Sequence, residues 1–199
     1  MEEKPVYYDK RAGFWKDHFK RAQNYGEYLA ASDTEKARRW AEMAKKIPPL
    51  TEEQRKRVAG FKRILNVLVY SGVWCGDCVR QGPMLHMIAS ACGENIHLRV
   101  IDRDASQELK DELRILGAMR VPVIVFLTED FFEVGRFGDR LLATYRAKAQ
   151  KELGATCETG LVPPPPDQLA AELAEWVDIV ERMLLMARLS PPLRQRHGD

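Results

Sequence analysis

The stretch Val73–Arg80 reads VWCGDCVR and places two cysteines, Cys75 and Cys78, three positions apart. The short apolar run Leu65–Tyr70 precedes this stretch and has the composition of a buried strand. Ser71 and Gly72 interrupt the run, and a helical pattern begins at the first cysteine. The sequence therefore predicts a strand, a tight turn, a pair of thiols and a helix, in that order.

A cysteine at the start of a helix lies close to backbone N–H groups that have no partner within the helix. These groups carry partial positive charge, which stabilises a thiolate over a thiol. The pKa of a cysteine in such a place falls from roughly 8.5 to about 3.5–7.5. Because the thiolate is the nucleophile, the spacing of Cys75 and Cys78 favours a redox-active pair that closes a small disulfide ring.

The composition excludes several classes of protein. A chain of 199 residues with 45% hydrophobic residues predicts one main domain with extensions. The net charge of +2 arises from 31 basic and 29 acidic residues, so we expect no nucleic-acid or membrane partner. The N-terminus carries no apolar signal region, and no apolar run approaches the roughly 18 residues of a membrane span. We therefore expect a cytoplasmic protein, and in a reducing compartment a Cys-x-x-Cys pair is catalytic or metal-binding.

Residues 1–63 are predicted to form a helical N-terminal extension, because apolar and aromatic residues recur there at spacings of three and four. The segments Ser32–Glu35 and Thr51–Gln54 both have the pattern of a capping box at a helix start. Pro48 and Pro49 end the helix that follows the first of these segments.

Residues 64–154 alternate between strand-like and helical segments and are predicted to form the main domain. After the helix that begins at Cys75, a crossover leads to a second strand parallel to the first. The later strands are too close in sequence for a crossover and should form an antiparallel hairpin. The expected elements are strands at Ile96–Asp102, Val121–Leu127 and Phe131–Phe137, a helix from Asp104 to Gly117, and a helix from Asp139 with Leu141, Leu142, Tyr145, Ala149 and Leu153 facing inward.

The C-terminal part is predicted to contain a linker, a helix and a tail. Residues 155–168 include Pro163–Pro166, which favours an extended linker. Residues 169–190 have one apolar face and should pack on the main domain. Residues 191–199 are expected to be a disordered tail.

The order of these elements resembles that of the thioredoxin superfamily over residues 64–154. The resemblance rests on four independent features of the sequence: Trp74 before the first cysteine, Gly76 between the cysteines, Pro83 in the following helix, and Val121-Pro122 where the family has its cis-proline. It implies an α/β, three-layer thioredoxin-like fold around a mixed sheet of about four strands. The family's first strand has no counterpart here, where the helical extension takes its place.

The resemblance also implies roles for individual residues. Cys75 would be the exposed attacking thiolate, and Cys78 would resolve the mixed disulfide. Trp74 would shield the site, supported by Gly76, Asp77 and Pro83, and the backbone of Val121 beside Pro122 would bind an extended substrate. The implied partners are protein disulfides and an unidentified reductant, and the redox-active Cys75–Cys78 disulfide replaces any separate cofactor.

Three positions depart from the family pattern. Typical thioredoxins have proline where this chain has Asp77, whose negative charge opposes formation of a thiolate, and Arg80 is expected to offset that charge. Val69 stands at the position of the family's buried acid and Leu98 near that of its partner lysine. The sequence therefore predicts that the usual proton shuttle is missing.

Two other functions compete with the redox prediction. A zinc site would need two more ligands beside Cys75 and Cys78, and the remaining candidates are isolated in the sequence: Cys92, Cys157, His86 and His97. We expect Cys92 and Cys157 to be inert and His86 to be packed or solvated. A non-catalytic thioredoxin-like interaction module is the second alternative, although the retained cysteine pair argues against it. The sequence thus favours a thiol–disulfide oxidoreductase that reduces protein disulfides in the cytoplasm.

Overall fold

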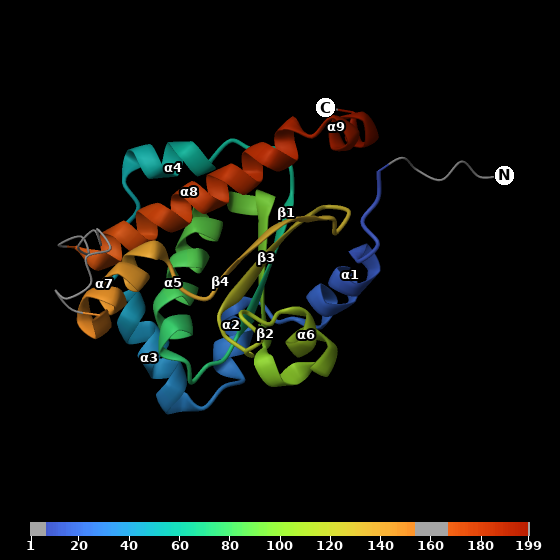
Figure 1. Cartoon of the computed structure of the whole chain (residues 1–199). Helices are drawn as coiled ribbons and strands as arrows, with labels where there is room; N and C mark the ends of the chain where they lie inside the picture. Colours follow the sequence, from blue (N-terminus) through green and yellow to red (C-terminus); the bar gives the residue numbers. More distant parts are fainter. Residues whose placement is uncertain (1–6, 154–166, 199) are drawn as a thin grey trace.

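A four-stranded mixed sheet forms the centre of the protein in a computed structural model, which describes residues 7–153 and 167–198. The strands are β1 (Leu65–Ser71), β2 (Ile96–Asp102), β3 (Val123–Thr128) and β4 (Glu133–Gly138), arranged in the order β2-β1-β3-β4. β1 is parallel to β2 and antiparallel to β3, and β3 and β4 form an antiparallel hairpin (Figure 1). The predicted α/β class and mixed four-stranded sheet are confirmed.

Helices cover both faces of the sheet. Figure 1 shows α5 (Gly76–Ala91) and α8 (Gln168–Leu189) on one face and α1 (Ala12–Arg21) on the other. α3 (Thr34–Ala44) packs against α5, while α4 (Glu52–Val58) and α7 (Leu142–Leu153) pack against α8. The remaining short helices are α2 (Tyr25–Ala30), η1 (Gly93–Asn95), η2 (Arg103–Ala105), α6 (Gln107–Glu112) and α9 (Pro191–His197).

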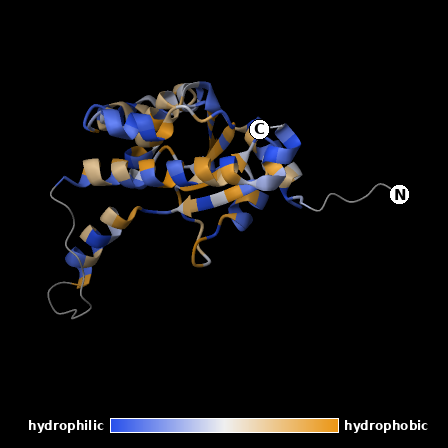
Figure 2. Ribbon diagram, turned by 90° about the horizontal axis from the view of Figure 1, so that it is seen from above, coloured by the Kyte–Doolittle hydropathy of each residue, from blue (hydrophilic) through white to orange (hydrophobic). Residues whose placement is uncertain are grey.

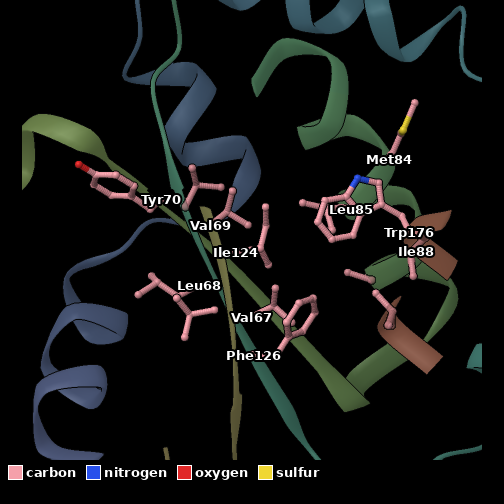
Figure 3. Close-up of a cluster of buried hydrophobic side chains, with 14 of the residues drawn as sticks. Val67, Leu68, Val69, Tyr70, Met84, Leu85, Ile88, Ile124, Phe126 and Trp176 are labelled. Atoms are coloured by element: carbon pink, nitrogen blue, oxygen red, sulfur yellow. The ribbon is translucent and has the colours of Figure 1, made fainter. Parts of the chain in front are cut away.

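The core extends through both faces of the sheet because every residue of β1 is buried. Successive side chains of a strand point to opposite faces. Figure 3 shows Val67 and Val69 on the side of α5 and α8, near Leu85 and Trp176, whereas Leu68 points the other way. Each buried aliphatic side chain stabilises the fold by roughly 1.5–3 kcal/mol. A central strand buried on both faces gives the following turn a rigid base.

The N-terminal helices are part of this core. Trp15 of α1 and Trp40 of α3 are fully buried. Between α1 and α2, Gln23 forms an antiparallel bridge with Val100, with backbone hydrogen bonds of 2.9 and 2.7 Å. This bridge covers part of the outer edge of β2, which would otherwise be open to pairing with another chain. Gln23 is an isolated bridging residue at this edge, not part of a strand.

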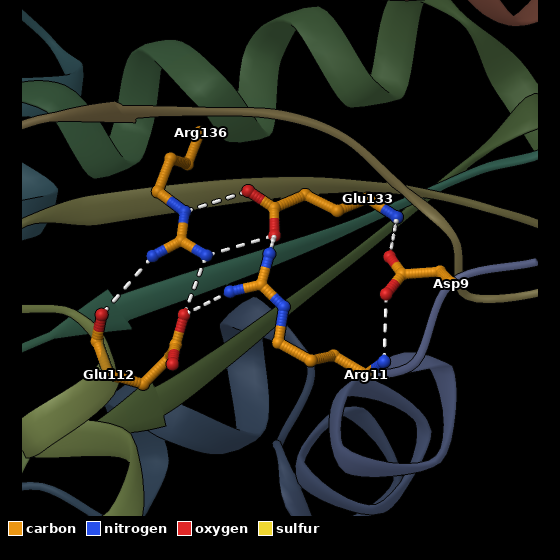
Figure 4. A network of polar contacts seen from close by, with 5 residues as sticks. All are labelled: Asp9, Arg11, Glu112, Glu133 and Arg136. Carbon is orange, nitrogen blue, oxygen red and sulfur yellow. Dashed lines mark hydrogen bonds and ion pairs between the residues drawn. The ribbon is translucent and has the colours of Figure 1, made fainter.

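A polar network ties the N-terminal segment to the sheet (Figure 4). Arg11 and Arg136 both bind the carboxylates of Glu112 and Glu133, with an Arg11–Glu133 distance of 2.6 Å and an Arg136–Glu112 distance of 2.8 Å. Asp9 accepts hydrogen bonds from the backbone N–H groups of Arg11 and Glu133 at 2.7 and 2.9 Å. Networks of this kind fix orientation more than isolated surface pairs do. The start of α1 is thereby held against β4.

The C-terminal helix is found where the sequence predicts it. Hydrophobic and hydrophilic residues alternate along α8 (Figure 2), and the buried apolar set is Leu173, Trp176, Val177, Val180, Leu184 and Ala187. The prediction of a disordered tail is wrong for residues 191–198: Pro191 and Pro192 open α9, and Leu193 is buried. Proline fits the first turn of a helix, where its missing N–H costs nothing. The Pro163–Pro166 linker lies outside the described residues. Among the described helices, none is long and apolar enough to cross a membrane.

Several predicted helix starts are displaced. The capping box at Thr51–Gln54 is confirmed, but Asp33 caps α3 in place of Ser32, whose hydroxyl donates to the carbonyl of Tyr28 at 2.7 Å. Ser106 caps α6 in place of Asp104, because Asp104 lies in a separate 3-10 turn. α6 also ends at Glu112, well before Gly117.

The start of α7 also differs from the prediction. Asp139 is buried in a cluster of polar side chains and does not cap the helix, which begins at Leu142. The carboxylate of Glu175 from α8 instead accepts hydrogen bonds from the N–H groups of Leu142 and Ala143 at 2.8 and 3.4 Å. Three side chains expected to face inward are exposed: Leu142, Tyr145 and Leu153.

Candidate active site

The two cysteines lie at the junction of β1 and α5, as predicted. β1 ends at Ser71, and the N–H of Cys75 donates to the carbonyl of Gly72 at 2.9 Å, which closes the turn. Cys75 is the N-cap of α5, with an extended backbone conformation (φ −77°, ψ 126°). Its sulfur therefore lies beside the first N–H groups of a sixteen-residue helix.

The environment of Cys75 favours its thiolate. A hydrogen bond from the Cys78 thiol, helped by the backbone N–H groups of Cys78 and Asp77, lowers the pKa of Cys75 to about 6. Burial and the charge of Asp77 act in the opposite direction. In its protonated form, the Cys75 thiol donates to the carbonyl of Val121 at a sulfur–oxygen distance of 3.5 Å. At neutral pH the balance leaves Cys75 mainly ionised.

Cys78 has the opposite character. Burial raises its pKa, as do its hydrogen bond to the Cys75 sulfur and the negative charge of that sulfur, and only 1% of the residue is exposed. The N–H of Gly72 donates to its sulfur at 3.5 Å. Cys75 was expected to be exposed, but only 9% of the residue is exposed. Its sulfur lies 3.5 Å from the carbonyl oxygen of Val121. Of the two thiols, Cys75 is nevertheless the more accessible and the more acidic.

The two cysteines should respond differently to pH. The rate at which iodoacetamide alkylates Cys75 is expected to rise with pH, through a midpoint of about 6, because only the thiolate reacts. Cys78 should stay unmodified over the same range, because it is buried and its pKa is raised. Mass spectrometry of the digested protein after timed alkylation measures both rates. A Cys75 midpoint near roughly 8.5, that of an ordinary cysteine, would contradict the assignment of a stabilised thiolate.

Side chains from other elements surround the pair. Trp74 is 44% exposed, and the guanidinium of Arg103 lies 4.8 Å from its ring centroid. The Val121–Pro122 peptide bond is cis, as the resemblance implied, and Pro122 directly precedes β3. Pro83 lies inside α5 and is buried. The fold thus brings Trp74 and Val121 to the cysteines at the start of α5, whereas Pro83 lies about two turns further along the helix.

The charge of Asp77 is offset by an arginine that the sequence did not indicate. Arg140 binds the carboxylate of Asp77 at 2.8 Å, and it also reaches Asp139 at 3.3 Å. Arg80, the predicted partner, points away and binds the buried carboxylate of Glu172 at 2.5 Å. The prediction for Arg80 is therefore wrong, because Arg80 pairs with Glu172 of α8 and Asp77 pairs with Arg140.

Trp40 is a second neighbour that sequence reasoning missed as part of the site. Its indole N–H donates to the carbonyl of Val73 at 3.0 Å, so a residue of α3 holds the turn before the cysteines. A Cβ on Gly82 would come within 2.1 Å of the Trp40 ring. Glycine at this position of α5 allows the ring to pack directly against the helix. The N-terminal helices therefore support the turn from which α5 starts.

A family model described as Thioredoxin matches residues 22–147, which is more than half of the chain. The protein is a member of the thioredoxin superfamily. This thioredoxin-like chain also resembles two solved structures, each with 18% sequence identity. One is a protein of unknown function, PA1234, from Pseudomonas aeruginosa, with a TM-score of 0.65 over 85% of this chain and 95% of that one. The other is an HIV epitope scaffold, with a TM-score of 0.60 over 88% of this chain and 98% of that one. No curated protein matches the sequence.

The thioredoxin-like core lacks charged side chains at the two positions where the sequence indicated a departure from the family, Val69 and Leu98. Val69 is buried in the central strand and supplies no acid there, and Leu98 is partly buried on β2. Cys92 is buried, and burial raises its pKa to about 12. His86 stacks on Tyr25 at a centroid distance of 4.2 Å, so it is packed as expected.

The alternative of a zinc site needs a group of ligands, and the part of the protein that the structure describes contains none. Within residues 7–153 and 167–198, no three His, Cys, Asp or Glu side chains are grouped so that they could hold a metal ion. Cys157 lies outside these ranges. The ring of His86 stacks on Tyr25, and the Nδ1 atom of His97 lies 3.2 Å from the side-chain oxygen of Asn66.

Proposed function

We propose that this thioredoxin-like protein is a thiol–disulfide oxidoreductase that reduces protein disulfides through Cys75 and Cys78. The observation that carries the proposal is the contrast between the two thiols. Cys75 caps a helix with its pKa lowered to about 6, and Cys78 is buried with its pKa raised. One thiol is thus prepared to attack, while the other keeps its proton until a mixed disulfide forms.

The reaction follows from these two states. The Cys75 thiolate attacks one sulfur of a substrate disulfide, forms a mixed disulfide and releases the other sulfur as a thiolate. Cys78 then loses its proton and attacks the Cys75 sulfur. The second substrate sulfur leaves with the electron pair of the broken bond. The substrate has gained two electrons, and Cys75 and Cys78 are left as a disulfide that an external dithiol must reduce.

The surroundings of the pair fit an extended peptide as substrate. The carbonyl of Val121 lies 3.5 Å from the Cys75 sulfur, in the segment that leads through Pro122 into β3. Backbone groups of such a segment are suited to hydrogen bonds with an extended chain. The exposed ring of Trp74 offers an apolar contact beside them. A reducing compartment such as the cytoplasm would keep the pair in its dithiol form.

Trapping a substrate tests the proposal. A Cys78→Ser variant should accumulate a mixed disulfide on Cys75 when it is incubated with insulin or a cell extract. The matched control is the double variant Cys75→Ser with Cys78→Ser, which should trap nothing. The wild-type protein should accelerate the reduction of insulin by dithiothreitol. If the wild-type protein gives no acceleration with dithiothreitol or any other reductant, the reductase proposal fails. Folded wild-type protein without such activity would favour the interaction module instead.

A further inference from the structure

Cys78 must lose a proton before it attacks, and the fold places a hydroxyl group next to it. Ser71, the last residue of β1, is fully buried. Its hydroxyl oxygen has no hydrogen-bond partner of ordinary geometry among residues 7–153 and 167–198. Ser71 directly precedes Gly72, whose N–H donates to the Cys78 sulfur at 3.5 Å, and the Ser71 hydroxyl acts to lower the pKa of both Cys78 and Tyr28, against burial, which raises both. A buried hydroxyl without a fixed partner is free to rotate between these two neighbours.

The next group in the line is the hydroxyl of Tyr28, which belongs to α2 in the N-terminal extension. Tyr28 is 3% exposed, and its hydroxyl donates to a carboxylate oxygen of Asp102 at 3.5 Å. Asp102 ends β2 and is the register partner of Ser71 on the neighbouring parallel strand. Its other carboxylate oxygen accepts the N–H of Asp104 at 2.8 Å, which fixes the carboxylate in place. Asp102 is half-buried, so a proton that reaches it can pass to water.

We propose that Ser71, Tyr28 and Asp102 form a proton relay that deprotonates Cys78 when it attacks the mixed disulfide. Three elements distant in sequence supply the relay: β1, β2 and α2. The inference rests on the proposed function, because it concerns the second step of that reaction. Tyr28 is a positioning residue, since it acts on Cys78 only through Ser71.

The relay balances the resolving step. The Cys78 thiol gives its proton to the Ser71 oxygen, Ser71 gives its own proton to Tyr28, and Tyr28 gives its own to the Asp102 carboxylate. The electron pair left on the Cys78 sulfur forms the bond to Cys75. The bond between Cys75 and the substrate sulfur breaks, and the substrate leaves as a thiolate. The two cysteines are oxidised, one substrate sulfur is reduced, and one proton rests on Asp102.

Other titratable groups near Cys78 are already engaged. Cys75 is bonded to the substrate in the intermediate that Cys78 attacks. Asp77, the neighbour of Cys78 in sequence, is paired with Arg140 at 2.8 Å. Arg103, beside Asp102, lies over the ring of Trp74 and within 3.6 Å of Asp104. Val69, which stands at the position of the family's buried acid, has no titratable group, and neither has its register partner Val100. The Ser71 hydroxyl is thus the side chain best placed to accept the proton.

The reaction of the reduced protein with 5,5′-dithiobis(2-nitrobenzoate), a coloured disulfide, separates the two steps. The first coloured thiolate is released when Cys75 attacks, and the second when Cys78 resolves the mixed disulfide. A Cys157→Ser background removes a competing thiol. We expect Ser71→Ala and Tyr28→Phe to slow the second phase at least about tenfold and to leave the first phase unchanged, since a positioned base usually contributes about 10²–10⁴-fold. Their second phase should also rise more steeply with pH, because hydroxide must then take the proton.

The matched control is Tyr70→Phe, which removes the hydroxyl of a fully buried tyrosine on β1, the strand that carries Ser71; this hydroxyl donates to the carbonyl of Arg103 at 3.5 Å. This variant should leave both phases unchanged. The relay is overturned if Ser71→Ala and Tyr28→Phe retain the wild-type second phase and its pH profile, or if they slow both phases equally. A wild-type protein that releases only the first thiolate would overturn the dithiol mechanism itself, and with it the proposed function.

Discussion

Replacing Cys75 by serine is expected to lower the rate of insulin reduction at least about a hundredfold, to the rate of the reductant alone, as is typical when an enzyme loses its nucleophile. Serine keeps the position and nearly the volume of the side chain. Its hydroxyl, however, stays protonated at neutral pH, whereas the hydrogen bond from Cys78, helped by backbone N–H groups at the helix start, lowers the pKa of Cys75 to about 6. Turbidity from precipitating insulin, followed with dithiothreitol as reductant, measures the loss.

The control for this variant is Cys92→Ser, at the other end of α5. Cys92 is buried, and burial raises its pKa to about 12, so its thiol is neither exposed nor ionised. The rate should stay within about twofold of the wild-type rate if this variant folds, because a buried thiol without thiolate character is inert. Full activity in Cys75→Ser, or a loss in Cys92→Ser equal to that in Cys75→Ser, would show that the reactive thiol has been assigned to the wrong cysteine.

The parts of the site that were predictable from the sequence depend on local patterns. The strand before the cysteines and the helix that starts at Cys75 follow from spacing within a few residues, whereas the role of Pro122 was implied by the resemblance to the thioredoxin superfamily. Local competition limits even these predictions, because Asp33 and Ser32 both suit an N-cap and only one can occupy it. The tail was predicted to be disordered because proline usually ends helices, yet Pro191 also suits the first turn of α9.

The pairings between distant elements were not predictable. Arg140 lies 63 positions after Asp77 (140 − 77), in the segment between β4 and α7, and only the tertiary fold brings the two charges to 2.8 Å. The same holds for Trp40, whose N–H reaches the carbonyl of Val73 from α3. A sequence pattern reports which face of an element is apolar, but it does not report which polar groups meet across two elements. The local electrostatics of the cysteines depend on such meetings.

Replacing Arg80 by alanine is expected to destabilise the protein by about 3 kcal/mol, because the carboxylate of Glu172 would lose its charged partner while it remains fully buried. Thr144 and Gln168 would still donate hydrogen bonds to this carboxylate at 2.7 and 2.9 Å, which keeps the loss at the lower end of the usual range. For a chain of this length, the midpoint of thermal unfolding should fall by about 6–12 °C. Calorimetry or circular dichroism measures the shift.

Two further variants test whether the loss of stability in Arg80→Ala comes from the unpaired Glu172 carboxylate or would follow the removal of any charged side chain. Lys56→Ala breaks an exposed pair with Glu52 and should cost less than about 1 kcal/mol. The double variant Arg80→Leu with Glu172→Leu should recover much of the loss, since an apolar pair removes the stranded charge. A cost below about 1 kcal/mol for Arg80→Ala would mean that the Glu172 carboxylate needs no cation.

The same variant decides which arginine acts on the reactive thiol. Arg80 is committed to Glu172, so Arg80→Ala should leave the alkylation midpoint of Cys75 at its wild-type value. Arg140→Ala should raise that midpoint, because the negative charge of Asp77, which already opposes the thiolate, would lose its partner at 2.8 Å. A raised midpoint in Arg80→Ala, with none in Arg140→Ala, would reverse the two roles. α5 thus uses its two charged contacts differently: the pair with Glu172 anchors α8, and the pair with Arg140 protects the acidity of Cys75.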